Sequence, residues 1–386
     1  MRLVPIECVR EGSYIGKTIY DKENRVLLHT GVELKENLIG KIKENGIYSI
    51  YINDEYSNNE IEDIVSPQIR NQASKMIKEA FKCIGKSINT SNNKMFDKKN
   101  KQMMDTHFQS IESIGKNIVD EMLSQKEIMI NLVDIKSLDN YMYQHSVNVA
   151  ILSMVLGIEI GLNRNQLYDL CMGALMHDIG MIFIPKEITN KKDKLTNEEL
   201  NIVKEHALKG YEYLKERQDI KPSARLIALQ HHERINGGGY PNGQDQDHIH
   251  IFSKIVAIVD TYDALISDRA YKKAVPQNEA IELIMGTGGR LFDFEMVKIF
   301  TKKVIPYPVG TLVELSNGEI GVVEKIEPQF PLRPIIKVVK QLAVTVEMTL
   351  IDLMKETNIV IKQIRYEIPN ACVPRQLNEG NSFKNQ

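Results

Sequence analysis

The chain has 386 residues, of which 42% are hydrophobic and 26% charged, a composition that excludes a disordered chain and predicts two or three globular domains. Its formal net charge of −2 gives no electrostatic reason to expect a nucleic acid polymer or an anionic membrane as a partner. Four scattered cysteines without a CxxC pair, and no uninterrupted apolar run long enough to span a bilayer, predict a cytoplasmic protein without a disulfide framework.

The first 60 residues are predicted to form a small α+β domain with a regulatory or docking role. Strands are predicted at residues 13–20, 26–28 and 48–52, and a helix at residues 34–45. The acidic and polar stretch that follows is typical of a linker, and it ends at Pro67.

Residues 61–124 are predicted to be a helical linker or stalk, interrupted by a polar stretch at 91–102. An apolar stripe with helical spacing follows this interruption and consists of Phe108, Ile111, Ile114, Ile118 and Met122. Two interpretations of the stripe remain open. Either it packs on the next domain, or it forms a homodimer through the helices of residues 61–124.

Residues 125–305 are predicted to be an all-helical domain, because nearly every segment with a clear apolar period has helical spacing. Residues 306–370 change to a β-rich extension, and residues 371–386 form a polar, loose tail. Strands of the extension are predicted at Leu312–Leu315, Gly321–Ile326, Ile335–Val339 and Leu342–Val346. The predicted fold class is therefore mainly α, with a small α+β domain before the helical domain and a small β-rich domain after it.

Imidazole and carboxylate side chains gather in the helical domain. They are His145 at the start of an apolar helix, the dipeptide His177-Asp178, His206, the pair His231-His232, and Asp260 on a second apolar helix. Each one alone is more often an ordinary core or surface residue, but together they suit iron, manganese, zinc or nickel. With His177 and Asp178 on a helix, about 100° apart around its axis, Asp178 could bridge to a second ion.

Two ions about 3.5–4 Å apart activate a water and hold a phosphoryl group, so this combination indicates hydrolysis of a phosphate ester. Di-iron oxidation is the alternative, but the Glu-x-x-His motifs of such helical bundles are missing. Arg269 and Lys272 follow the helix that carries Asp260 and Asp263, and they could either receive substrate phosphates or simply form a solvated helix end.

Residues 125–305 resemble the HD-GYP domain, a subgroup of the HD phosphohydrolase superfamily that hydrolyses cyclic di-GMP. The resemblance rests on YQHSVNVA at 143–150, HDIG at 177–180, KLTNEE at 194–199, HHERINGGGYP at 231–241, DTYDALISDRAYK at 260–272 and GGRLFD at 288–293. The small domains before and after this region are also similar to domains that flank HD-GYP domains.

The resemblance implies a bacterial second-messenger phosphodiesterase with two divalent transition metal ions, iron or manganese. The implied metal ligands are His145, His177, Asp178, His206, His231, His232 and Asp260, with Asp178 bridging. A hydroxide activated by the metals would attack phosphorus and open cyclic di-GMP to pGpG, which could then be cleaved to GMP. The implied substrate-binding residues are Gly239, Tyr240 and Pro241 in a loop near the substrate, and Asp263, Arg269 and Lys272, which are implied to contact the ligand phosphates or to support the metal ligands.

This sequence departs from the family pattern at two positions. Met181 replaces the lysine of the usual HDIGK motif, so activity could be reduced and a nucleotide receptor with slow or absent turnover becomes an alternative function. Tyr141 stands where some members have a glutamate for a third ion, which favours two ions. A second alternative keeps the chemistry but uses another cyclic dinucleotide or a linear nucleotide, because base selection depends on the shape of the pocket.

Overall fold

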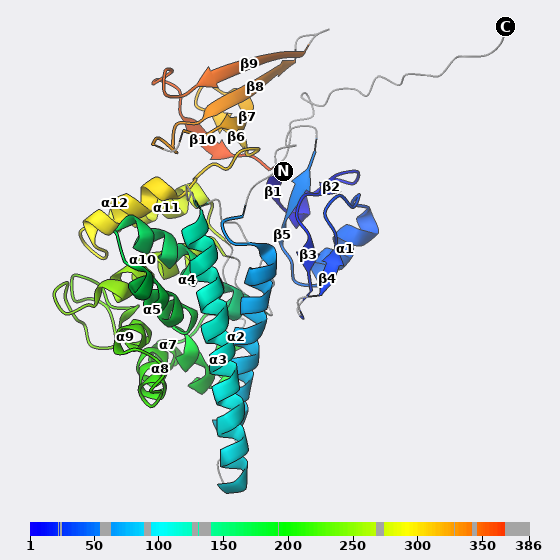
Figure 1. The fold of residues 1–386 in the computed structure, drawn as a ribbon. Coiled ribbons are helices and arrows are strands. Elements are labelled where there is room, and N and C mark those ends of the chain that lie inside the picture. The colour runs from blue at the N-terminus through cyan, green and yellow to red at the C-terminus, as the bar shows by residue number, and fades with distance from the viewer. Residues whose placement is uncertain are drawn as a thin grey trace.

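The computed structural model describes residues 1–21, 23, 25–54, 63–88, 94–125, 130, 140–191, 193–267, 274–327, 329–341 and 346–366. These residues form an N-terminal α+β domain, a pair of long helices, a helical body and a C-terminal sheet (Figure 1). The fold class therefore agrees with the prediction. Four predicted features fall outside the described residues: Arg269, Lys272, most of the strand at Leu342–Val346, and the tail at 371–386.

The N-terminal domain is built on a three-stranded antiparallel sheet with the order β1-β5-β2. Its elements are β1 (Arg2–Pro5), the 3-10 helix η1 (Ile6–Cys8), β2 (Tyr14–Ile15), β3 (Ile19–Tyr20), β4 (Val26–Leu28), α1 (Glu36–Glu44) and β5 (Ser49–Asn53). Apolar side chains such as Val4, Ile15, Ile42 and Ile50 fill its core. The sequence did not predict β1, because its run is only four residues long and ends in a proline.

Helices α2 (Pro67–Ile88) and α3 (Lys94–Ser124) lie side by side along the helical body (Figure 1). The predicted break at 91–102 is too long, since α3 already begins at Lys94. All five residues of the apolar stripe from Phe108 to Met122 are buried, and they share one core with the helical body. The stripe is therefore used inside the chain, which removes its support for a homodimer.

The helical body consists of nine α-helices and a 3-10 helix within the described residues. They are α4 (Tyr141–Glu159), α5 (Arg164–Leu175), η3 (Ile179–Phe183), α6 (Lys186–Thr189), α7 (Asn197–Lys204), α8 (His206–Lys215), α9 (Pro222–Gln230), α10 (Ile251–Leu265), α11 (Gln277–Thr287) and α12 (Phe294–Lys303). Asn163 and Thr196 each form a capping box, which fixes where α5 and α7 begin.

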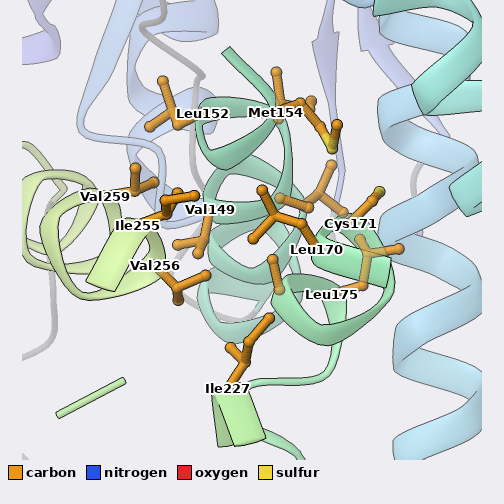
Figure 2. Packing of buried hydrophobic residues seen from close by; sticks show 14 of the residues in the cluster. Val149, Leu152, Met154, Leu170, Cys171, Leu175, Ile227, Ile255, Val256 and Val259 are labelled. Atoms are coloured by element: carbon orange, nitrogen blue, oxygen red, sulfur yellow. The ribbon is translucent and has the colours of Figure 1, made fainter. Parts of the chain in front are cut away.

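Helix α4 lies at the centre of this body, because all its residues from His145 to Gly157 are buried. Figure 2 shows Val149, Leu152 and Met154 of α4 packed among side chains of α5, α9 and α10. Each fully buried aliphatic side chain of this kind stabilises the fold by roughly 1.5–3 kcal/mol. The polar residues that α4 and α10 carry are thus held by a rigid apolar frame.

The C-terminal sheet has five antiparallel strands in the order β10-β6-β7-β8-β9. They are β6 (Leu312–Leu315), β7 (Ile320–Lys325), β8 (Ile335–Gln341), β9 (Val346–Asp352) and β10 (Ile361–Ile364). The first three agree with the prediction, whereas β10 was missed because its four residues carry two polar side chains in the middle.

Among the described helices, none is long and apolar enough to cross a membrane.

Candidate metal centre

The His177-Asp178 dipeptide lies in a turn, not on a helix as the sequence predicted. Helix α5 ends at Leu175, and the 3-10 helix η3 begins only at Ile179. Backbone bonds from Ile179 N to Met176 O and from Met181 N to Asp178 O close this turn tightly. The argument for a bridging Asp178 from helix geometry is therefore wrong, and the arrangement of the two side chains comes from the turn.

Gly180 lets this turn approach the start of α8. A Cβ at Gly180 would overlap the carbonyl oxygen of His206 and would lie 2.7 Å from the amide nitrogen of Gly210. Only a residue without a side chain fits such a contact. The close approach places Asp178 Oδ1 3.3 Å from His206 Nε2.

The first group of candidate ligands consists of His145, His177 and Asp178. His177 Nε2 lies 3.5 Å from Asp178 Oδ2 and 3.9 Å from Asp260 Oδ1. His145 Nε2, from the first turns of α4, lies 3.0 Å from the same oxygen of Asp260 on α10. Two ligand atoms about 2.1 Å from one ion are roughly 3 to 4 Å apart, so these separations match those around a metal ion.

The second group consists of Asp178, His206, His231 and His232. His206 opens α8, while His231 and His232 follow directly after the last residue of α9. His206 Nε2 lies 3.2 Å from His231 Nε2, and His231 Nε2 lies 3.7 Å from Asp178 Oδ1. Asp178 thus belongs to both groups, and Asp260 also approaches the second, with Oδ2 3.8 Å from His232 Nδ1.

Four of the histidines have their Nδ1 atom fixed outside the cluster. His177 donates to Ala174 O at 2.8 Å, His206 to Val203 O at 2.7 Å and His231 to Ile227 O at 2.9 Å. A carbonyl oxygen can only accept, so each of these rings carries a proton on Nδ1, and Nε2 is the nitrogen that faces the cluster. His145 Nδ1 is paired in the same way with Asp263 Oδ2 at 2.6 Å. Histidine ligands of metals are usually oriented by such outer bonds.

His177 provides the clearest test of whether the residues of this cluster fit a metal ion. Its side chain is fully buried, and its Nε2 finds no hydrogen-bond partner among the described residues. A buried nitrogen left without a partner costs about 1–3 kcal/mol. A cation bound there would satisfy that nitrogen, so the residues present fit a metal ion.

Burial and the two carboxylates act in opposite directions on the protonation of the centre. Burial disfavours the imidazolium of His177, but Asp178 and Asp260 outweigh it and raise the pKa of His177 to about 9. Burial also disfavours the charged form of Asp178, yet His177, His206 and His231 hold its pKa well below the usual range. For His232 burial prevails, with the neighbouring His231 adding to it, and the pKa is lowered.

The loop that contains Gly239, Tyr240 and Pro241 lies beside the second group. The ring of Tyr240 stacks on His232 with centroids 4.6 Å apart, and Lys204 Nζ lies 5.5 Å from the centroid of the Tyr240 ring. Gly239 packs directly on the backbone that follows His232, where a Cβ would lie only 2.5 Å from His232 O. Gly239 is thus required by close packing of this loop.

Sequence reasoning missed Glu233, which holds this loop in place. Its buried carboxylate accepts the backbone N–H groups of Asn242 at 2.8 Å and Gln244 at 2.9 Å. The sequence offered only the position of Glu233 as a signal, directly after the two histidines and ahead of the glycine-rich loop. Only the folded loop, however, shows which amides it binds.

The remaining predicted residues have different surroundings. Asp263 is 2% exposed and directed at His145 and Asn148, so its carboxylate is turned away from solvent. The ring of Tyr141 stacks on His145 with centroids 5.4 Å apart. Met181 is partly buried in η3, directly after the HD turn.

Two family models and several curated relatives match this chain. The family model of the HD domain matches residues 127–296, and that of the KOW domain associated with HD domains matches residues 312–367. A curated cyclic di-GMP phosphodiesterase of Pseudomonas aeruginosa is 36% identical over 228 residues, which are 58% of this chain and 55% of the relative. The cyclic di-GMP phosphodiesterase PdeB of Borreliella burgdorferi is 34% identical over 228 residues, covering 58% of this chain and 60% of PdeB.

A relative with another named substrate also matches. The 3'3'-cGAMP-specific phosphodiesterase 1 of Vibrio cholerae is 31% identical over 194 residues, which are 45% of this chain and 42% of that protein. This chain therefore spans between two fifths and three fifths of the length of these three curated relatives.

Proposed function

We propose that this chain, which carries an HD domain over residues 127–296 and an HD-associated KOW domain over residues 312–367, is a metal-dependent phosphodiesterase that hydrolyses cyclic di-GMP. The observation that carries the proposal is that Asp178 belongs to two groups of candidate ligands at once. A carboxylate shared in this way is what a two-metal centre needs. The substrate is inferred from the two relatives that are named as cyclic di-GMP phosphodiesterases.

We assign His145, His177 and Asp260 to one ion, and His206, His231 and His232 to the other, with Asp178 between them. Imidazole and carboxylate ligands suit iron or manganese. Two such ions would supply an activated water and neutralise charge on the phosphate. Asp178 holds the two groups together, and the 3.0 Å separation of His145 Nε2 from Asp260 Oδ1 is that of two ligands of one ion. We assign Asp263 to the orientation of His145 and not to substrate binding, because it is buried against that ring.

We assign Gly239, Tyr240 and Pro241 to the substrate side of the centre. Burial, together with Asp178 and Asp260, raises the pKa of Tyr240, so its phenol stays protonated and can donate a hydrogen bond to a phosphate oxygen. Lys204 beside the Tyr240 ring adds a positive charge at the same place. Arg269 and Lys272 stay predictions as further phosphate contacts, as does cleavage beyond pGpG to GMP.

A second candidate substrate is 3'3'-cGAMP, which is favoured by the match to the phosphodiesterase of Vibrio cholerae that is specific for it. Competition between the two cyclic dinucleotides at equal concentration separates these candidates. The receptor alternative rests on Met181, and it predicts bound nucleotide without any linear product.

The decisive test is metal analysis of protein purified without oxygen, combined with chromatography of the products formed from cyclic di-GMP. The proposal predicts about two transition metal ions per chain and formation of pGpG. Asp178→Ala should lose both ions and all turnover, because it removes the ligand that the two groups share. Full metal content together with retained activity in this variant would contradict the two-metal assignment.

We also propose that the protein acts in the cytoplasm, on the support of its four cysteines, which the sequence scatters without pairing motifs. A homodimer stays a prediction, and light scattering of the purified protein would test it.

A further inference from the structure

Helix α2 lies outside the matched HD domain, yet it carries a buried arginine that contacts the central helix α4. Arg70 is 6% exposed and donates from Nη1 to Asn148 Oδ1 on α4 at 3.2 Å. Its Nε atom donates to Val65 O at 3.1 Å, at the end of the segment that leads from the N-terminal domain into α2. The guanidinium therefore joins this segment to the central helix of the body.

Asn148 continues the connection to a candidate metal ligand. Its Nδ2 donates to Asp263 Oδ1 at 3.3 Å, and Asp263 Oδ2 is paired with His145 Nδ1 at 2.6 Å. A guanidinium can only donate and an ionised carboxylate can only accept, so the amide of Asn148 has one orientation that satisfies both neighbours. The buried network thus runs from Arg70 through Asn148 and Asp263 to His145.

All four members of this network are at most 6% exposed, so its hydrogen bonds are shielded from water. A second polar contact lies ahead of His145 in the chain, where Lys78 Nζ of α2 donates to Oδ1 of Asn140, the residue directly before α4, at 2.7 Å. Helix α2 therefore holds α4 both before and after His145. Loss of a buried partner from such a network leaves the next polar group unsatisfied, which disturbs its position.

We infer that Arg70 is a positioning residue of the metal centre. Helix α2 then contributes to the geometry of the site, although it lies outside the matched HD domain. The inference rests on the proposed two-metal centre and extends it to a residue 57 positions before the matched region begins. Arg70 orients the amide of Asn148, Asn148 orients Asp263, and Asp263 fixes the ring of His145 so that Nε2 faces Asp260.

Metal binding to the full chain, stripped of metal, tests the inference without any substrate. Titration with Co²⁺, followed by its visible absorption, gives the number of ions and their affinities. Arg70→Met keeps the aliphatic part of the side chain but removes its donors and charge. Arg70→Met should weaken the binding of one of the two ions by about 10- to 100-fold, which is typical for loss of a hydrogen-bond partner of a metal ligand. Asn148→Leu should have the same effect, and the double variant should be no worse than either single variant.

Arg217→Met is the matched control. Arg217 is partly buried and joins the body to α3 through a 2.7 Å contact with Asp105, and it also pairs with Asp219. Neither Asp105 nor Asp219 belongs to the network around His145. This control should lower thermal stability and leave both Co²⁺ affinities unchanged.

Arg70→Lys keeps the positive charge but loses the planar guanidinium with its several donors. Its affinity for the affected ion should lie between those of the unchanged protein and of Arg70→Met. If Arg70→Met does not fold, Arg70→Lys and Asn148→Leu carry the same test. Normal Co²⁺ affinities in folded variants, measured well below their melting temperatures, would overturn the role of Arg70 alone. Failure of the unchanged protein to bind two ions would instead overturn the two-metal proposal and this inference with it.

Discussion

In four of the five candidate histidine ligands, a bond at Nδ1 leaves Nε2 as the ring nitrogen that faces the cluster. The sequence could predict which residues gather, because imidazole and carboxylate are recognisable metal ligands. It could not predict the carbonyl groups of Ala174, Val203 and Ile227 that fix the rings, since every residue has a carbonyl. The surroundings of Asp263 could not be predicted for a related reason, because only the folded structure shows that it faces His145.

Met181 is the residue at which this chain departs most from the pattern it resembles. Met181→Lys should raise kcat/KM for cyclic di-GMP by about 10- to 100-fold, because one charge-assisted contact with a phosphate is worth roughly 1.5–3 kcal/mol. Met181→Gln, which is polar and uncharged, is the control and should stay near the original value. Steady-state kinetics at fixed metal content give the answer. An unchanged rate would mean that another cation, such as Lys204, already supplies the charge.

The protonation of His177 predicts how metal binding depends on pH. Its pKa of about 9 in the metal-free protein means that at pH 7 a proton occupies the nitrogen that a metal would need. Metal affinity should therefore rise as the pH increases toward 9, with release of a proton. Calorimetry in buffers with different ionisation enthalpies measures that release.

The same pKa has the opposite effect on the stability of the metal-free protein. Because the pKa is raised above the ordinary 6.5, the contact of His177 with Asp178 stabilises the fold fully below pH 6.5 and is lost as the pH rises through 9. Denaturation of the metal-free protein at several pH values would show this trend.

For metal binding, an affinity that does not change between pH 6.5 and 9 would contradict the assignment of His177 as a ligand.

At the scale of elements, turns position the centre more than helices do. His177, Asp178 and His232 lie in turns, while His145 and His206 lie at the beginnings of helices. Apolar periodicity predicted the helical body well, but it could not place the end of α5, because the apolar pattern continues through Met176 and Ile179 into η3. The wrong prediction that His177 and Asp178 lie on a helix has this physical origin.

The contact between η3 and α8 predicts the effect of Gly180→Ala. A methyl group there overlaps His206 O, so the fold should lose about 1–3 kcal/mol and the second metal should bind more weakly. Gly286→Ala is the control, since nothing lies within 4 Å of its Cβ position on α11, and it should stabilise the protein by about 0.5–1 kcal/mol. Chemical denaturation and metal titration of both variants measure these effects. Equal stability of the two variants would show that η3 and α8 can separate freely.

At the scale of the molecule, the sequence predicted the order of the parts but not how they share a core. Composition and periodicity separate the strand-rich ends from the helical region. They cannot show whether an apolar stripe packs against the same chain or a second one, because both partners offer the same kind of surface. The stripe from Phe108 to Met122 is an example, since only the structure shows that it packs within the chain.

Removal of metal should lower the stability of the whole helical body. The candidate ligands come from segments as far apart as His145 and Asp260, so bound ions cross-link the chain over 115 positions. Metal at a thousand times its dissociation constant stabilises a protein by about 4 kcal/mol, which corresponds to roughly 10 °C in Tm for a domain of this size. Scanning calorimetry before and after chelation should show a fall of this order. Manganese should restore the original Tm, whereas an unchanged Tm after chelation would argue against a cross-linking centre.

The shared core has a consequence for how damaging substitutions would be distributed in a genetic screen. Among the described residues, one core joins buried side chains from Ile64 to Val304, although the matched HD domain begins only at residue 127. Loss-of-function alleles should therefore be as frequent at the buried positions of α2 and α3 as in the HD domain itself. A map of tolerance along the gene would place the first boundary near codon 64, where the folding unit begins, and not where sequence similarity begins.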